Sequence, residues 1–556
     1  MSEQTTPLRC EPHPISGAVY QAIGDGLVRV DDKAKDTWGI FRHDGTWVEG
    51  EMTYADKHLL GYVAGPDLPP GADVLWTVMP ALADDLPGWA AAQQAAHEGK
   101  PQRPKIIAKY TNDPGIDTPE GPRSAAHIPL EFFLENDRRP DLIPDVYHKS
   151  APVPGGPEKV PTARYFEKRY HDLEVEHIWK KCWQMACRED DIPEVGDYHL
   201  YKVASLQFLV VRTAPDEIKA FENVCLHRGR QLRDCSGKRA TEFRCPYHGW
   251  QWRIDGTLRA IPAEWDFGGD VRDDVARLPE AKVARWGGFV WINPDPNSLS
   301  FEDYAGPEML EHYRKMKLQN RYKQADVTKV VRANWKVLQE AFMEGYHALA
   351  THPQLLLSGS ECADVRFDNF GNWSRLGHVG VSGSCPHRGM ALSREQALEI
   401  YQQTADFMRN VLRDMIGDEV EAYSDAELND QGFNNLFPNT SPWGGWARVV
   451  YNFRPNGDNP DESLMRVMFL APWPEGKEKP APREQRFLSA DQYWTEAPEL
   501  VAFAKIFDQD VGNLPYVQSG LKAKSQPYVW MSGYQESVIR AFHRNYAERL
   551  GLKEGE

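Results

Sequence analysis

Hydrophobic and polar side chains alternate along several stretches of the chain, in the pattern typical of short antiparallel strands. The clearest stretch, residues 196–224, alternates in this way and is interrupted by turns that contain Gly, Pro and Asp. A strand-like stretch punctuated by Gly occurs at residues 26–52, and strands are also predicted at 446–455 and 463–473. The pattern therefore predicts strands in the first, middle and last parts of the chain.

Other stretches place apolar residues at helical spacing. In residues 163–188, for example, Tyr170, Leu173 and Ile178 recur near the helical period. The Pro- and Gly-rich stretch 150–161 is typical of a linker or an extended crossing. Further helices are predicted at residues 88–100, 310–318 and 393–417.

Composition and charge narrow the class of protein. The chain has 556 residues, of which 41% are hydrophobic and 26% charged, so two or three globular domains are expected. Its net charge of −17 disfavours binding to nucleic acids and to anionic membranes. We expect neither a signal peptide nor a membrane span, because the apolar runs are short. Eight Cys are too few for a disulfide framework, so a cytoplasmic location is expected.

The stretch "CLHRGRQLRDCSGKRATEFRCPYHGW" (225–250) holds two Cys–His pairs, Cys225 with His227 and Cys245 with His248. Zinc sites usually carry one ligand type on each loop, whereas each loop here offers a thiolate and an imidazole. That arrangement favours a [2Fe–2S] cluster with both Cys on one iron and both His on the other, which raises its reduction potential. A zinc site and a chance arrangement are the alternatives. Cys235, between the loops, is interpreted as a structural thiol.

The C-x-H-x₁₇-C-x₂-H pattern with "CPYHGW" resembles the Rieske domain of the Rieske non-haem iron oxygenases, in particular the alpha subunits of the aromatic-ring-hydroxylating type. The resemblance implies an α+β protein, with an all-β Rieske [2Fe-2S] domain and an antiparallel-sheet, helix-grip (START/Bet v1-like) catalytic domain. We expect an N-terminal extension that is structural or subunit-contacting, with a lid over the active site as the minor alternative. The expected division is extension 1–150, linker and entry helix 151–195, Rieske domain 196–300 and catalytic domain 301–556.

A second metal site is indicated by "NWKVLQEAFMEGYHALATHPQLL" (334–356). On a straight α-helix His347 and His352 would lie about 140° apart, so they share an ion only if the helix widens or ends between them, as Pro353 favours. The stretch resembles a signature of the same family, which implies that both His bind mononuclear Fe(II). The resemblance also implies a downstream carboxylate, here Asp510, with Asp508 as the alternative. Two imidazoles and one carboxylate leave positions open for water and O₂.

Glu344 lies three residues before His347, on the same face if this stretch is helical. The resemblance implies that this carboxylate links His248 of one subunit to His347 of its neighbour and carries the electron. It therefore implies a homotrimer, with or without small beta subunits. The sequence shows neither a dinucleotide-binding nor a P-loop motif. We therefore expect an NAD(P)H-dependent reductase, with or without a ferredoxin, as the electron source.

Two departures from the family pattern bear on the reaction. Glu344 stands where ring-dihydroxylating members usually have Asp, and in this respect resembles members that act on quaternary amines. Ala341 replaces a frequent Asn. The main prediction is oxygenation of an aromatic or polycyclic hydrophobic substrate with O₂. Candidate pocket residues are Phe342, Met343, Ala348 and Leu349.

Other reactions and other classes of protein remain open. Within the family, the alternative is O- or N-demethylation or monohydroxylation, including that of quaternary amines. Outside it, the alternatives are an electron-transfer Rieske protein without oxygenase activity and a zinc-stabilised interaction protein.

Overall fold

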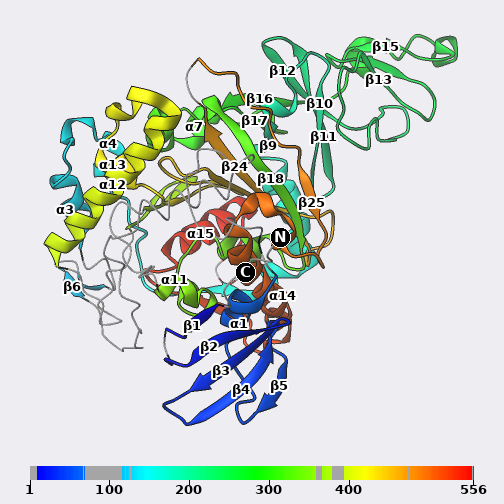
Figure 1. Cartoon of the computed structure of the whole chain (residues 1–556). Helices are drawn as coiled ribbons and strands as arrows, with labels where there is room; N and C mark the ends of the chain where they lie inside the picture. The colour runs from blue at the N-terminus through cyan, green and yellow to red at the C-terminus, as the bar shows by residue number, and fades with distance from the viewer. Residues whose placement is uncertain are drawn as a thin grey trace, which may run out of the picture.

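The computed structural model describes residues 9–14, 16–66, 68, 116–118, 121–123, 128–357, 366–377, 393–473, 476–553 and 555. These residues form an N-terminal sheet, a middle domain of strands and a large C-terminal sheet with helices around it (Figure 1). The predicted α+β class is confirmed. The helix predicted at 88–100 lies outside the described residues. In the described part of the chain, no helix has the length and apolar character needed to cross a bilayer.

The N-terminal domain, residues 9–66, is an antiparallel meander covered by one helix. Its strands pair in chain order, and Leu59 and Leu60 of the helix pack on Val28 and Phe41 of the sheet. Asp56 caps the helix by accepting its first backbone N–H groups. The elements are β1 (Cys10–Pro12), β2 (Val19–Gly24), β3 (Leu27–Asp32), β4 (Thr37–Arg42), β5 (Trp47–Gly50) and α1 (Lys57–Ala64).

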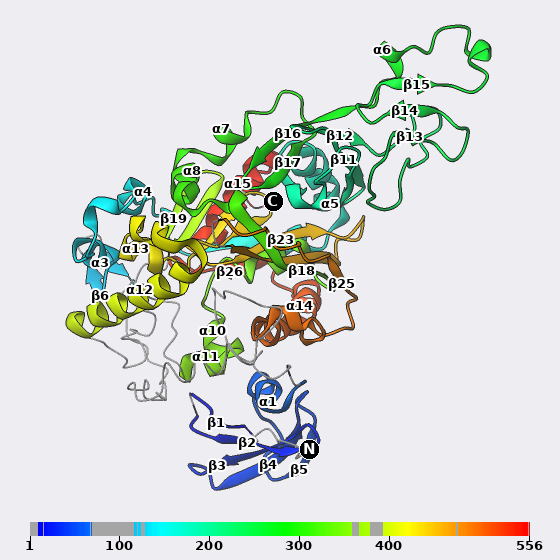
Figure 2. The same cartoon turned by 45° about the horizontal axis from the view of Figure 1, so that its top comes forward.

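The middle domain contains a six-stranded antiparallel sheet and a smaller three-stranded sheet, as the alternation at 196–224 predicts. The large sheet has the order β10-β11-β12-β16-β17-β9, and the small sheet β13-β14-β15 projects from it (Figure 2). The strands are β9 (Gln184–Arg188), β10 (Tyr198–Val203), β11 (Leu206–Ala214), β12 (Glu217–Glu222), β13 (Glu242–Arg244), β14 (Gln251–Arg253), β15 (Leu258–Ala260), β16 (Glu280–Trp286) and β17 (Phe289–Asn293). A short helix, α6 (Asp273–Ala276), follows β15.

The C-terminal sheet has eight strands in the order β19-β20-β21-β22-β23-β24-β18-β25. All neighbours are antiparallel except β25, which runs parallel to β18. β23 and β24 are buried along almost their whole length, and both were predicted as strands. The strands are β18 (Arg321–Val331), β19 (Arg366–Phe370), β20 (Trp373–Gly377), β21 (Phe433–Leu436), β22 (Thr440–Pro442), β23 (Val449–Pro455), β24 (Ser463–Pro472) and β25 (Arg486–Leu488).

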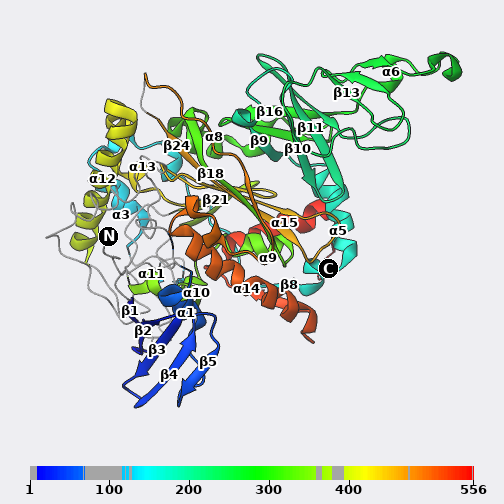
Figure 3. The ribbon, with the colours of Figure 1, turned by 45° about the vertical axis from the view of Figure 1, so that its right-hand side comes forward.

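Helices surround this sheet, and the longest of them matches the helix predicted at 393–417 (Figure 3). Two short strand pairs, β6 (Ile116–Thr118) with β7 (Gly121–Arg123) and β8 (Glu158–Pro161) with β26 (Tyr528–Met531), complete the described elements. The helices are α3 (Leu130–Glu135), α4 (Asp145–His148), α5 (Lys168–Glu174), α7 (Phe301–Ala305), α8 (Pro307–Tyr313), α9 (Trp335–Glu340), α10 (Ala348–Thr351), α11 (Pro353–Leu357), α12 (Arg394–Ile416), α13 (Asp425–Asn429), α14 (Phe503–Ala523) and α15 (Ser537–Leu550).

The structure corrects two helix predictions. The stretch 163–188 is helical only in part: α5 continues into a turn of π-helix, Val175–Trp179, and the chain then enters β9. β9 is fully buried and pairs with β17, so tertiary pairing overrides the apolar spacing there. In the stretch 310–318, α8 ends at Tyr313 and 3₁₀ turns follow.

Residues 128–148 pack on the C-terminal domain instead of on the N-terminal sheet. Arg138 donates to the buried carboxylate of Asp425 at 2.5 Å, and Tyr147 donates to Asp430 at 2.8 Å. The range 1–150 therefore holds more than one structural unit, and the domain boundaries given above stay a prediction.

Candidate metal centres

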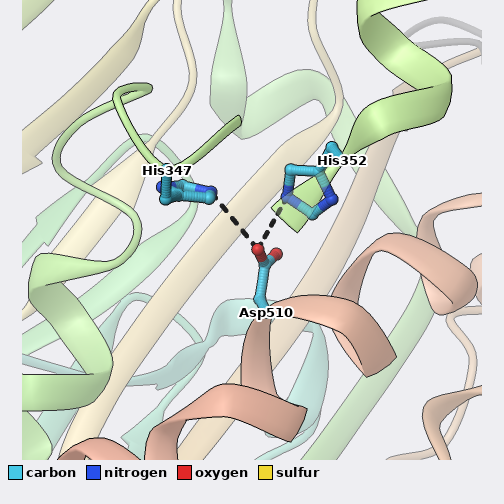
Figure 4. A group of neighbouring side chains, drawn as sticks. All are labelled: His347, His352 and Asp510. Carbon is cyan, nitrogen blue, oxygen red and sulfur yellow. Dashed lines mark ion pairs between the residues drawn. The ribbon is translucent and has the colours of Figure 1, made fainter. Parts of the chain in front are cut away.

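The side chains of His347, His352 and Asp510 point toward one another, with both His facing the carboxylate of Asp510 (Figure 4). The Oδ1 atom of Asp510 lies 2.7 Å from Nε2 of His352 and 3.3 Å from Nε2 of His347. One ligand atom from each of the three residues lies within 4.8 Å of the other two. This spacing is compatible with one shared metal ion.

The local sequence explains why the two His converge. They flank α10, a helix of only four residues, with His347 at its N-cap and His352 at its C-cap. His352 has a non-helical backbone (φ −123°, ψ 61°), as expected for a residue that precedes Pro353. The helix therefore lies between the two His and ends at His352, where Pro353 favours an ending.

The charges of the three residues also fit a metal cation. Burial raises the pKa of Asp510, but the two imidazoles lower it by more, so its pKa lies far below the usual range. Burial lowers the pKa of His347, but Glu344 and Asp510 raise it to about 10. Asp510 Oδ1 is buried and makes no directed hydrogen bond within the described residues. Two imidazoles and a carboxylate are the facial ligand set of mononuclear ferrous sites. A divalent cation bound here would take the place of the proton that the raised pKa keeps on His347.

Asp508 does not join this group. Its carboxylate accepts backbone N–H groups from Trp494 at 2.7 Å and Thr495 at 3.2 Å. Burial raises the pKa of Asp508 to about 6. The structure therefore assigns Asp508 to a loop contact and favours Asp510 as the third ligand.

Both His are held by side chains on the side away from the candidate metal. Glu344 lies 2.6 Å from Nδ1 of His347 and also accepts the His347 backbone N–H at 3.0 Å. The explanation from a shared helical face is wrong, because residues 341–347 form an irregular connection between α9 and α10. Gln509 lies 2.9 Å from Nδ1 of His352 through its Oε1 atom. Each Nε2 is thus left for the metal.

The two Cys–His loops of the middle domain have the same local geometry. In each loop the N–H of Cys225 or Cys245 donates to the carbonyl five residues later at 2.8 Å. The N–H of Gly229 or Gly249 donates back to the Cys carbonyl, at 2.9 and 3.1 Å. Both Gly have positive φ, 73° and 79°, which L side chains rarely adopt. The repeat turns the two Cys and the two His toward a common site.

The donor set of these loops fits a [2Fe–2S] cluster. The rings of His227 and His248 lie 4.6 Å apart, and Nδ1 of His227 is buried without a hydrogen-bond partner among the described residues. Burial raises the pKa of the Cys225 thiol. Burial also raises that of Cys245, but backbone N–H groups of Tyr247 and His248 lower the pKa of this thiol by more. Such N–H groups also stabilise cluster-bound sulfur. His248 is exposed, whereas both Cys are buried.

Aromatic side chains pack beside the three-residue centre. The ring centre of Phe342 lies 5.1 Å from that of Tyr451 and 6.2 Å from that of Phe507. Phe507 precedes Asp510 by about one turn of α14. Of the predicted pocket residues, Phe342 and Met343 are buried and Ala348 is half-buried, while the Leu349 side chain lies outside the described residues. Neither Tyr451 nor Gln509 was singled out from the sequence, because no motif marks them.

Comparisons with known proteins agree with both centres. Residues 182–273 match the family described as "Rieske [2Fe-2S] domain". Residues 310–552 match "Ring hydroxylating alpha subunit (catalytic domain)". The first range contains the two Cys–His loops and the second contains the His–His–Asp group.

Curated relatives match about a third of the chain. The carnitine monooxygenase oxygenase subunit of Escherichia coli (strain K12) is 30% identical over 200 residues, 35% of this chain and 52% of that protein. The glycine betaine monooxygenase oxygenase subunit of Pseudomonas aeruginosa (strain UCBPP-PA14) is 30% identical over 207 residues, 37% of this chain and 47% of that protein. The anthranilate 1,2-dioxygenase large subunit of Acinetobacter baylyi is 28% identical over 195 residues, 34% and 41% respectively. The chain thus spans about half the length of the curated relatives it matches.

Two solved structures share the fold over a larger part of the chain. A quaternary ammonium Rieske monooxygenase in complex with L-carnitine aligns with a TM-score of 0.52 and 19% identity, over 71% of this chain and 96% of that chain. Naphthalene 1,2-dioxygenase with indole bound aligns with a TM-score of 0.52 and 19% identity, over 70% and 92%. At this identity the likeness shows the fold.

Proposed function

The chain combines a Rieske [2Fe–2S] domain with the catalytic domain of a ring-hydroxylating alpha subunit, and we propose that it is the oxygenase component of a multicomponent Rieske oxygenase. In this proposal Cys225, His227, Cys245 and His248 hold the cluster. His347, His352 and Asp510 hold mononuclear Fe(II). The observation that carries the proposal is the convergence of these last three side chains, from α10 and α14, in a chain that also has both cluster loops.

The proposed reaction inserts oxygen into a substrate C–H bond. Substrate, O₂, two electrons and two protons give the hydroxylated product and water. A ferrous ion held by His347, His352 and Asp510 would supply O₂ activation, and a cluster held by the two Cys–His loops would supply electrons one at a time. Glu344 and Gln509 fix the two imidazoles, and the buried aromatic side chains exclude water. We propose that the electrons come from NAD(P)H through a separate reductase, with or without a ferredoxin.

For the substrate we propose a quaternary amine instead of the aromatic compound first expected. Two of the similar proteins are named for carnitine and glycine betaine. The resemblance noted in the sequence points the same way, because Glu344 stands where ring-dihydroxylating members usually have Asp. The aromatic group of Phe342, Tyr451 and Phe507 lies beside the metal centre, and aromatic faces attract cationic ammonium groups. Hydroxylation of a carbon bonded to the cationic nitrogen gives a product that splits into a tertiary amine and a carbonyl compound.

Aromatic dihydroxylation is the second candidate. It is favoured by the similarity to the anthranilate 1,2-dioxygenase large subunit. The two candidates differ in the fate of O₂, because dihydroxylation places both oxygen atoms in one product and monooxygenation only one.

A substrate panel with a surrogate reductase and ¹⁸O₂ tests both candidates. The panel pairs carnitine and glycine betaine with anthranilate and naphthalene, and carbonyl products are trapped before their oxygen exchanges with water. We expect a tertiary amine and one ¹⁸O atom in the carbonyl product. Two ¹⁸O atoms in a diol would support the second candidate. A reduced cluster that is reoxidised without any product would favour an electron carrier.

We propose that the functional assembly is a homotrimer. In Figures 1, 2 and 3 the β13–β15 end of the middle domain projects away from α10 and α14, which carry the other centre. An electron path through Glu344 therefore needs the exposed His248 of a neighbouring chain. Light scattering on the purified protein should show three copies of this chain per particle, and a stable monomer with full turnover would contradict the trimer.

A further inference from the structure

The N-terminal domain packs directly against α14, which carries Asp510, and against α11, which begins directly after His352. α1 lies beside α11 and α14 in all three views and contacts both (Figure 2). Lys57 places its ammonium group 4.8 Å from the centre of the Tyr516 ring on α14. His58, the next residue, interacts electrostatically with both His352 and Asp510. This domain therefore borders the metal site.

A chain of hydrogen bonds links this domain to one metal ligand. His352 Nδ1 lies 2.9 Å from Oε1 of Gln509, and Nε2 of Gln509 donates to the backbone carbonyl of His58 at 3.2 Å. Gln509 and His352 are both buried. Because the bonds are shielded from water, a lost partner here would leave a polar group unsatisfied.

The N-terminal domain sets which groups donate and which accept in these hydrogen bonds. A Gln side chain can present either its oxygen or its NH₂ group to a neighbouring ring nitrogen. Gln354 pairs with both ends of the Gln509 amide, at 2.7 and 3.1 Å, and can reverse together with it. A backbone carbonyl only accepts, so the His58 carbonyl requires the NH₂ group on its side. The Gln509 oxygen must then face His352.

We propose that the N-terminal domain is a positioning element of the mononuclear iron site. By fixing the Gln509 amide, the His58 carbonyl keeps the proton of His352 on Nδ1 and leaves its Nε2 lone pair for the metal. Gln509 is thus a positioning residue that acts through His352. The inference rests on the metal site and not on the reaction proposed for it.

Fe(II) affinity tests this inference without turnover. The full-length protein, with its cluster intact and its mononuclear iron removed, is dialysed anaerobically against Fe(II). We expect Gln509→Leu to weaken Fe(II) binding by about 10- to 100-fold, the range for lost partners of ligating His. Gln354→Leu is the matched control, because it removes the amide pair but keeps the chain from His58 to His352. It should stay within about twofold of the unsubstituted protein.

Hydrogen exchange of α1 tests the coupling from the other side. Coupling between two sites is reciprocal, so Fe(II) binding should protect the backbone amides of α1. We expect this added protection in the unsubstituted protein and in Gln354→Leu, and we expect it to disappear in Gln509→Leu. A purely structural role of Gln509 would not make α1 exchange depend on iron.

A second variant tests the same link by a change in the N-terminal domain. Asp56→Ala removes the cap that accepts the N–H groups of His58 and Leu59 and should weaken Fe(II) binding although Asp56 contacts no ligand. Asp31→Ala, which breaks the Arg29–Asp31 pair on the sheet, is its control.

Two results would overturn the inference. One is Fe(II) binding that is equal in Gln509→Leu and in the unsubstituted protein, and the other is α1 exchange that ignores iron in the unsubstituted protein. A protein that binds no Fe(II) would overturn the metal site itself. A protein that shows the coupling but oxidises no substrate would overturn only the proposed function.

Discussion

Asp508 and Asp510 show how two positions on one helix decide the role of a carboxylate. Both lie on α14, yet Asp508 turns toward the backbone of residues 494–495 and Asp510 toward His347 and His352. The sequence left both as candidates, because the spacing of an Asp-x-Asp pair does not show which side chain faces the two His. The contacts decide between them.

Replacing Asp510 separates the two centres. Asp510→Ala should lose the mononuclear iron and keep the cluster, because only the former uses this carboxylate. Iron analysis should fall from about three to about two atoms per chain, with an unchanged cluster spectrum. Asp508→Ala is the matched control and should keep all of its iron. The reverse pattern would show that the ligand is Asp508.

Glu344 offers a test of electron transfer that leaves the ligands in place. Glu344→Gln keeps an oxygen that accepts from His347 but removes the negative charge, so both centres should stay filled. Product formed per electron consumed should fall by about 10- to 100-fold, as for other outer partners of ligating His. Wild-type coupling in a fully iron-loaded variant would remove Glu344 from the path.

At the scale of elements, the hydrophobic pattern predicted the long periodic segments. It failed where contacts between residues far apart in the sequence decide the secondary structure. α12 follows its helical periodicity closely, and β24 forms where a strand was predicted, although it is buried on both faces. β9 does not follow the helical pattern, because its burial depends on β17, about a hundred residues later. At the site, motifs pointed to the candidate ligands, but the Gln509–His58 bond joins residues whose proximity no local sequence signal predicts.

Three helices meet at the buried carboxylate of Glu174, at the end of α5. It accepts from Trp335 Nε1 and Tyr546 Oη, each at 2.8 Å, and pairs with the buried ammonium of Lys336. Glu174→Gln should lower the free energy of unfolding by about 3–5 kcal/mol, because it leaves the Lys336 charge without its partner. Urea unfolding followed by tryptophan fluorescence measures this loss. Replacing Glu174 and Lys336 together with Leu and Met should recover much of it, and an equal loss in the double variant would argue against charge as the cause.

The attachment of residues 128–148 should depend on pH. Burial raises the pKa of Asp425, but Arg138 and Arg409 lower it by more, so the folded-state pKa lies below the ordinary 3.8. The stabilisation by this carboxylate is present above that ordinary value and is lost as the pH falls through the folded-state pKa. Asp425→Asn should therefore lower the melting temperature at pH 7, and the difference from wild type should vanish at strongly acid pH. A difference that does not depend on pH would assign the effect to packing.

At the scale of the whole molecule, the two candidate metal centres occupy separate parts of one chain, and in the proposed trimer function depends on how the chains meet. The sequence contains recognisable motifs for the cluster loops and the candidate iron ligands. No such motif marks the interface between chains in the proposed trimer. In a single chain His248 is exposed.

Mixed assemblies test this dependence. His248→Ala should lack a competent cluster and Asp510→Ala the mononuclear iron, so each homotrimer should be inactive. Co-expressed in equal amounts, they should recover about a quarter of wild-type turnover, because a directed contact between a cluster-bearing chain and an iron-bearing neighbour then occurs by chance. Activity in separately purified and mixed samples should stay near zero. The absence of any recovery on co-expression, with mixed trimers verified by mass spectrometry, would place electron transfer within one chain.

The bond between His58 and Gln509 joins residues 451 positions apart. A ribosome makes His58 first, and Gln509 follows only after 451 further positions have been translated. The N-terminal sheet can fold long before α14 exists, but it must wait for that helix before it can dock. Until then His352 has neither Gln509 nor Asp510 beside it, so the complete set of three candidate ligands exists only after α14 has been made.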